Sequence, residues 1–103
     1  MKLFISADIE GCVGTTLASE THKETPEYRQ FAKRMTDEVR IVCQAALEAG
    51  ADEIVVKDGH GDATNIDFTA MPEGVTLIRG KSGHPYNMMF GLDETFDGVL
   101  YVG

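Results

Sequence analysis

The sequence has no tryptophan and contains only 2 cysteines and 3 prolines among 103 residues. Two cysteines do not make a disulfide framework, so we expect a reducing, cytoplasmic compartment. No apolar run approaches the roughly 18 residues that span a bilayer. Lys2 is followed by only a few mostly apolar residues before Asp8 interrupts them, so we expect no secretory signal peptide in this stretch.

Positive charge is scarce as well. Lysine and arginine number 9 against 17 acidic residues, and the formal net charge is -8. This balance argues against a nucleic-acid backbone or an anionic membrane as the main partner. Acidity also favours solubility, so it excludes partners without identifying one. The hydrophobic content of 43% and the length predict at most one ordinary globular domain.

Short apolar runs bounded by Gly, Asp or Pro indicate buried strands. They occupy residues 3–7, 53–57, 75–78 and 98–102. A helix is expected between the first two, over about residues 26–49, with Thr25 as its N-cap, Pro26 in its first turn and Gly50 as its stop. Its apolar stripe, at spacings of three or four, comprises Phe31, Met35, Val39, Val42 and Ala46.

A strand–helix–strand unit predicts parallel strands with a right-handed crossover. Short helical turns are also possible at residues 65–71 and 86–92. We therefore predict an α/β fold of three layers, with a mainly parallel sheet and flanking helices. Because residues 98–102 should lead into a functional loop, the domain is expected to continue after this fourth strand, beyond Gly103.

Acidic residues follow the first strand directly, in the run Asp8-Ile9-Glu10-Gly11. Ligands of open α/β sheets bind beyond the carboxyl ends of the strands. Asp8 and Glu10 are two residues apart, so in extended geometry their carboxylates point to the same side. Two adjacent carboxylates repel each other, and a bound cation would reverse that repulsion. The pattern predicts a metal site.

A third ligand is predicted at the end of the second strand. His60 lies between Gly59 and Gly61, which leave its imidazole unobstructed. Together with Asp8 and Glu10 it would form an O/O/N set suited to zinc, manganese or a similar divalent ion. Its other ring N–H would need an acceptor, and two acids of the same loop are candidates. They are Asp58 and Asp62.

Structural roles are the alternative for each of these residues. Asp8 could cap a turn, Glu10 could be a solvated acid and His60 a surface residue. The cysteines Cys12 and Cys43 are expected to pack in the interior. The two remaining histidines, His22 and His84, are expected in solvent and in a structural loop, respectively.

Several segments together resemble the DppA-type zinc D-aminopeptidases, the M55 metallopeptidases. The matching segments are residues 2–11 (KLFISADIEG), 58–60 (DGH), Met88 with 91–96 (GLDETF), and 98–103 (GVLYVG). The resemblance covers nearly the whole chain. It does not include residues 12–25, which carry no familiar motif.

The resemblance implies a two-zinc centre with a bridging aspartate, and Asp8, Glu10 and His60 match three of its ligands. It also implies an aminopeptidase that removes D-residues from short peptides such as D-Ala-D-Ala, in a ring-shaped cytoplasmic homo-oligomer. The remaining ligands, a histidine and a glutamate, and a catalytic histidine would lie beyond Gly103. Residues 1–103 would thus be the N-terminal part of a single metallopeptidase domain, with no catalytic residue of its own, weak metal binding and little peptidase activity.

Two other functions remain open from the residues. A strand that ends in acid-x-acid also suits an aspartyl nucleophile with Mg²⁺ in phosphoryl transfer. Loose candidates for phosphate-binding partners are Thr15-Thr16 and Lys81-Ser82. A non-catalytic metal-binding or assembly remnant is the third possibility. Two measurements would separate the three functions: the zinc content of the chain, and hydrolysis of a D-Ala peptide compared with that of p-nitrophenyl phosphate.

Overall fold

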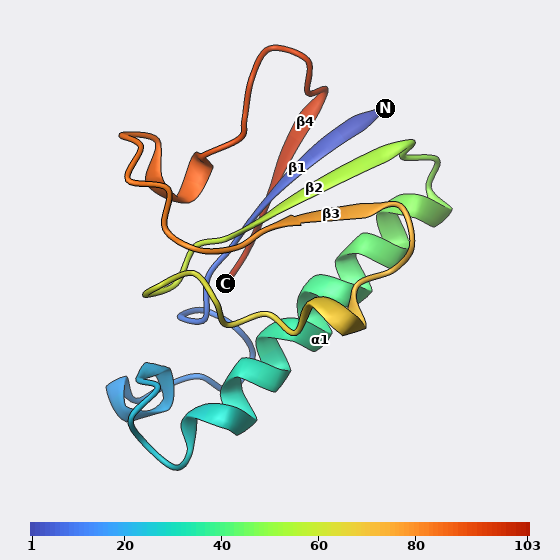
Figure 1. Ribbon diagram of the computed structural model, residues 1–103. Helices are drawn as coiled ribbons and strands as arrows, with labels where there is room; N and C mark the ends of the chain where they lie inside the picture. The colour runs from blue at the N-terminus through green and yellow to red at the C-terminus, as the bar shows by residue number, and fades with distance from the viewer.

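The computed structural model describes residues 1–103 and contains one parallel sheet of four strands, in the order β3-β2-β1-β4 (Figure 1). The strands are β1 (Lys2–Ala7), β2 (Glu53–Asp58), β3 (Val75–Ile78) and β4 (Gly98–Val102). Every neighbouring pair is parallel. The α/β class and all four predicted strands are confirmed.

The register brings the ends of the central strands together. Ala7, the last residue of β1, pairs with Asp58 on β2 and with Val102 on β4. Parallel pairing places the carboxyl ends of all three strands at one edge of the sheet. The segments that follow β1 and β2 therefore leave the sheet side by side.

One face of the sheet is covered by α1 (Tyr28–Glu48), which Figure 1 shows lying along the strands. The helix begins at Tyr28, so the prediction of Thr25 as its N-cap was wrong. The Thr25 hydroxyl instead donates to the carbonyls of Ser19 and His22, which closes a turn before the helix. Gly50, with φ +107°, ends the helix as predicted.

The buried face of α1 is rotated slightly from the predicted stripe. Met35 and Val39 are fully buried at its centre. Phe31, Val42 and Ala46 are only partly buried and pack at its margins. The rest of the buried face consists of Tyr28, Ala32, Thr36 and Cys43. The sequence pattern missed it because small, polar and aromatic residues fill those positions.

The other face of the sheet is covered by the connection between β3 and β4, which includes η3 (Asn87–Met89), a single 3₁₀ turn within the predicted helical region (Figure 1). Phe96 packs edge-on against Phe4 at 5.4 Å between ring centroids. The Ser6 hydroxyl donates to the carbonyl of Met88 at 3.0 Å.

Two further 3₁₀ turns complete the chain, η1 (Ala18–Thr21) and η2 (Phe68–Ala70). η2 is what remains of the short helix predicted at residues 65–71. No helix is long and apolar enough to cross a membrane.

Candidate metal centre

The predicted ligands converge at the carboxyl edge of the sheet. Asp8 and Glu10 follow β1, and His60 follows β2. Hydrogen bonds continue beyond the strands and hold both segments: the Asp8 N–H donates to Val102 O and the Gly59 N–H donates to Ala7 O, each at 2.8 Å. The carboxyl ends of the strands therefore place the two acids and the imidazole in one cluster.

The cluster is tight. Nδ1 of His60 lies 2.9 Å from Oε2 of Glu10 and 3.3 Å from Oδ1 of Asp8. One ligand atom from each residue lies within 4.8 Å of the other two. The imidazole is largely buried, with 16% of its side chain exposed, whereas Glu10 is 58% exposed. The cluster is thus buried on the side of His60 and open to solvent on the side of Glu10.

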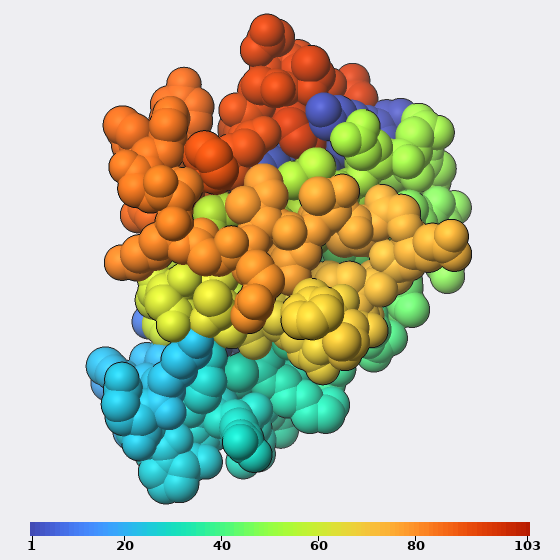
Figure 2. All heavy atoms as spheres, viewed as in Figure 1, coloured from blue at the N-terminus to red at the C-terminus, as the bar shows by residue number.

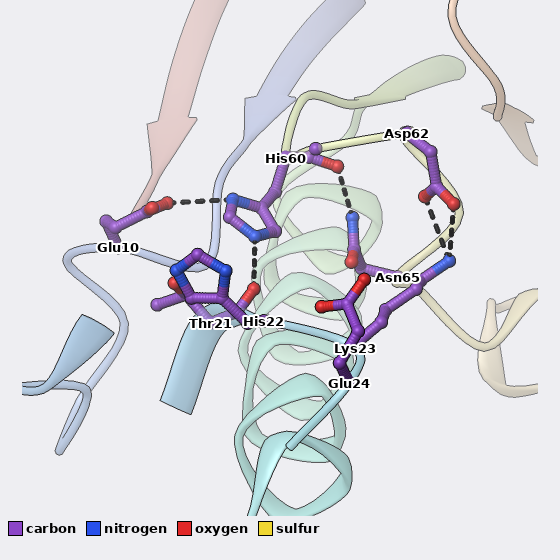
Figure 3. A pocket seen from close by; sticks show the side chains of 9 residues that line it. Glu10, Thr21, His22, Lys23, Glu24, His60, Asp62 and Asn65 are labelled. Atoms are coloured by element: carbon purple, nitrogen blue, oxygen red, sulfur yellow. Dashed lines mark hydrogen bonds and ion pairs between the residues drawn. The ribbon is translucent and has the colours of Figure 1, made fainter. Parts of the chain in front are cut away.

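The other ring nitrogen of His60 is fixed by a residue that the sequence did not indicate. Nε2 lies 2.6 Å from the backbone carbonyl of Thr21, at the end of η1 (Figure 3). A carbonyl only accepts, so Nε2 carries a proton and this hydrogen bond fixes the direction of the ring. Nδ1 therefore faces Asp8 and Glu10, the direction in which a neutral ring would offer its lone pair to a metal ion.

Neither acid predicted to accept from His60 does so. Asp58 is fully buried and accepts from the backbone N–H groups of Asn65 and Ile66 at 2.7 and 2.8 Å. It also accepts from the Asn65 side chain at 2.9 Å and from the His60 N–H at 3.3 Å. Asp58 therefore shapes the loop that carries His60, through its backbone.

Asp62 points away from the imidazole and binds a lysine. Its two carboxylate oxygens lie 2.9 and 2.8 Å from Nζ of Lys23, as Figure 3 shows. The hydrogen bond from Lys23 and a second from Thr64 lower the pKa of Asp62 to about 2. The acid is ionised at neutral pH, and its negative charge is paired with the ammonium group of Lys23.

The pKa values of the two acids of the cluster shift in opposite directions. Burial, a hydrogen bond with Glu10 and the charge of Glu10 raise the pKa of Asp8. Burial acts to raise the pKa of Glu10 too, but hydrogen bonds from Asp8 and the backbone, with the nearby His60, lower it overall. Two acids this close repel each other when both are ionised. A divalent cation would relieve that repulsion, so the donor set fits a metal ion.

Close backbone packing supports the turn after β1. Gly11 has φ +93°, and a Cβ there would lie 2.4 Å from the carbonyl carbon of Gly103. The residue after β4 thus packs directly against the turn that presents Glu10. Only glycine permits this approach, which gives the last residue of the Asp-x-Glu-Gly run a physical reason.

A polar hollow of about 330 Å³ opens beside the cluster. None of its lining residues is hydrophobic, and Figure 3 shows several of them. They include Glu10, His60 and, from the segment around η1, His22 and Glu24. His22 is exposed as expected, but it borders this hollow, which the sequence did not indicate.

The other candidates take structural positions. Cys12 is buried beneath the turn and its thiol donates to the Asp8 carbonyl at 3.1 Å, while Cys43 is buried in the core. The ring of His84 packs against Tyr86 and Phe90. Thr15 and Thr16 line a separate hollow that Glu10 also borders. Ser82 accepts from the His84 N–H.

Comparison with known proteins identifies the family of the chain. The model of the D-aminopeptidase family, peptidase family M55, matches residues 1–103. The chain belongs to this family. A D-aminopeptidase of Bacillus subtilis (strain 168) is 31% identical over 103 residues, which are 100% of this chain and 37% of that protein.

A solved M55 structure has the same fold. It is the Zn-dependent D-aminopeptidase DppA from Bacillus subtilis, described as a self-compartmentalizing protease, and it superposes with a TM-score of 0.94 at 31% identity. The match covers 100% of this chain and 37% of that one. This chain therefore spans a little over a third of the length of the relatives it matches.

Proposed function

We propose that Asp8, Glu10 and His60 bind zinc and form part of the active site of a D-aminopeptidase. The observation that carries the proposal is the position of the His60 Nδ1 atom. Nδ1 faces both carboxylates, at 2.9 and 3.3 Å, while Nε2 is held by the Thr21 carbonyl. Membership of a family whose solved relative is zinc-dependent supports zinc over other divalent ions.

Each residue has a distinct part in this proposal. His60 presents a neutral nitrogen whose direction is fixed by its own hydrogen bond. Asp8 is the less exposed of the two acids. Its two carboxylate oxygens would bridge two zinc ions, as the family resemblance implies. Glu10, on the solvent side, would hold one of them. Zinc bound there would lower the pKa of a water molecule and polarise the carbonyl of a peptide.

The substrate class we propose is short peptides with an N-terminal D-residue, such as D-Ala-D-Ala. The polar hollow beside the cluster suits a small, charged, hydrophilic ligand. Preference for the D-stereoisomer rests on the family alone. We also propose that residues 1–103 are the N-terminal part of one catalytic domain, with further ligands and the catalytic histidine beyond Gly103. We propose a homo-oligomer because the solved relative is self-compartmentalizing, and a cytoplasmic location because two cysteines make no disulfide framework.

Zinc content and affinity test the site directly. Zinc bound per chain is measured by mass spectrometry after dialysis, and affinity by competition with a chromophoric chelator. His60→Ala should weaken binding at least about 100-fold, because a ligand and its hydrogen-bonded support are both lost. His84→Ala is the matched control: this ring packs against Tyr86 and Phe90, so its loss should leave affinity unchanged.

Three results would contradict parts of the proposal. No zinc bound to the chain or to the protein that contains it would favour a non-catalytic remnant. Hydrolysis of p-nitrophenyl phosphate with Mg²⁺, and not of a D-Ala peptide, would favour phosphoryl transfer. Zinc-dependent peptidase turnover by residues 1–103 alone, lost in His60→Ala, would show that no further ligands are needed.

A further inference from the structure

The segment around η1 is joined to the loop that carries His60 at two points. The first is the hydrogen bond from His60 Nε2 to the Thr21 carbonyl. The second is Lys23, whose ammonium group binds both oxygens of Asp62 and the hydroxyl of Thr64. Figure 2 shows the light-blue η1 segment seated against the yellow-green loop that follows β2.

The two links join the same two segments at neighbouring positions. Thr21 and Lys23 are two residues apart on one segment, and His60 and Asp62 are two apart on the other. The links therefore lie side by side, as Figure 3 shows, and each limits the movement allowed to the other. Breaking the lysine link would leave the imidazole as the main polar contact between the two segments.

The Thr21 carbonyl can orient His60 only if the carbonyl itself is fixed. The other hydrogen bonds near it are internal to the segment: the Thr21 hydroxyl donates to Ala18 O at 2.8 Å, and the Thr25 hydroxyl donates to His22 O. These bonds preserve the shape of the turn. They do not join it to the loop of His60. Apart from the imidazole itself, the polar contacts that do so are those of Lys23.

Lys23 also suits this task chemically. Its ammonium group has three donors, and three acceptor oxygens surround it, from Asp62 and Thr64. The Lys23 side chain is 40% exposed, so the pair adds little to overall stability. Its effect should therefore appear at the site more than in the free energy of unfolding.

We propose that Lys23 is a positioning residue for the metal centre: by holding Asp62 and Thr64, it keeps the Thr21 carbonyl over Nε2 of His60 and thereby directs Nδ1 toward Asp8 and Glu10. The metal part of this inference rests on the function proposed above. The positioning of the imidazole does not, and it is tested without metal.

In the metal-free protein, ¹⁵N NMR of the imidazole reports the hydrogen bond of Nε2–H, with the His60 signals assigned by their loss in His60→Ala. The wild type should show one sharp signal for a protonated Nε2 that is hydrogen-bonded to the Thr21 carbonyl. Lys23→Met, which keeps the aliphatic stem and removes the ammonium group, should broaden and shift this signal because the hydrogen bond is no longer held in place. Lys23→Arg should restore the wild-type signal. An unchanged spectrum for Lys23→Met, with the fold intact, would overturn the proposal.

In the zinc-bound protein, Lys23→Met should weaken zinc affinity about threefold to tenfold, less than the loss of a direct hydrogen-bond partner of a ligand. The visible absorption of the Co²⁺-substituted site should shift as well. Lys33→Met is the control, since it breaks another exposed lysine–aspartate ion pair, with Asp37 on α1, and should change neither. Wild-type affinity in Lys23→Met would overturn the inference. If the wild type binds no zinc, the proposed function is contradicted, and the NMR result then decides whether Lys23 positions the imidazole.

Discussion

At the scale of single residues, the site depends on which hydrogen bonds are already made before a ligand arrives. His60 has one nitrogen committed to Thr21 and the other free to face two carboxylates. Asp58 is ionisable and fully buried, yet four N–H groups surround its two oxygens. A buried carboxylate with that many donors is a structural anchor, and its task is to hold the loop of His60 in shape.

Asp58→Asn should therefore destabilise the protein. An amide turns one acceptor oxygen into an NH₂ group that faces other N–H donors, so at least one buried hydrogen bond is replaced by repulsion. We expect the free energy of unfolding, measured by urea denaturation, to fall by about 2–4 kcal/mol. The control is Asp67→Asn, an exposed acid that caps η2 and should cost less than about 1 kcal/mol. Equal costs for the two variants would show that Asp58 is not an anchor.

At the scale of elements, the segments after β1 and β2 supply the three residues of the cluster. The connection through η3 packs on the face of the sheet opposite α1. Lys57, buried at the end of β2, donates to the carbonyls of Asp58 and Gly80 and so ties β2 to the segment after β3. Met88 of η3 packs against Gly59, next to His60. The loop of His60 is thus held between η1 on one side and η3 on the other.

Gly59→Ala tests this close packing. A Cβ at residue 59 would lie 2.9 Å from the Ala7 carbonyl oxygen and 2.9 Å from the terminal carbon of Met88. The methionine end can move but the backbone of β1 cannot, so we expect a loss of about 1–3 kcal/mol in the free energy of unfolding. Met88→Ala in the same chain should recover only part of this loss.

The control for the backbone contact is Gly61→Asn. Gly61 has φ +57° and open space around it, and asparagine adopts this conformation readily. It should leave stability nearly unchanged. Full recovery of Gly59→Ala by Met88→Ala would place the whole clash on the side chain and none on β1.

At the scale of the whole molecule, one core joins the sheet to α1. The radius of gyration of 13.2 Å is that of a compact chain of this length. Both cysteines belong to this core. Burial raises the pKa of Cys43 to about 11 and, together with the nearby Glu38 carboxylate, that of Cys12 to about 12.

The thiols should therefore report on opening of the core. At pH 8 an unfolded thiol, with a pKa of about 8.5, is partly ionised and reacts with a disulfide reagent, whereas both native thiols stay protonated and covered. We expect little labelling in the folded protein and complete labelling in urea. The urea concentration at half-maximal labelling should equal the midpoint of unfolding. Fast labelling of one thiol in the folded state would show that its part of the core opens locally.

Much of this molecule could be predicted from local patterns. Strands buried on both faces read as short continuous apolar runs, and burial repeats every three or four residues in a helix, so the four strands, α1 and its end at Gly50 are visible in the sequence. Asp8, Glu10 and His60 were predicted to meet because the ends of parallel strands share one edge. That reasoning needs only the strand positions and the parallel topology.

Only the tertiary structure decided the surroundings of the cluster. The sequence suggested Asp58 and Asp62 as acceptors for His60, but the acceptor is the Thr21 carbonyl, 39 residues away along the chain. A backbone carbonyl has no signature in a sequence, and residues 12–25 have no periodicity that would place them over the loop of His60. The sequence by itself determined which groups could bind a metal. Long-range packing decided which of their hydrogen bonds are already made, and therefore which atom of His60 faces the two acids.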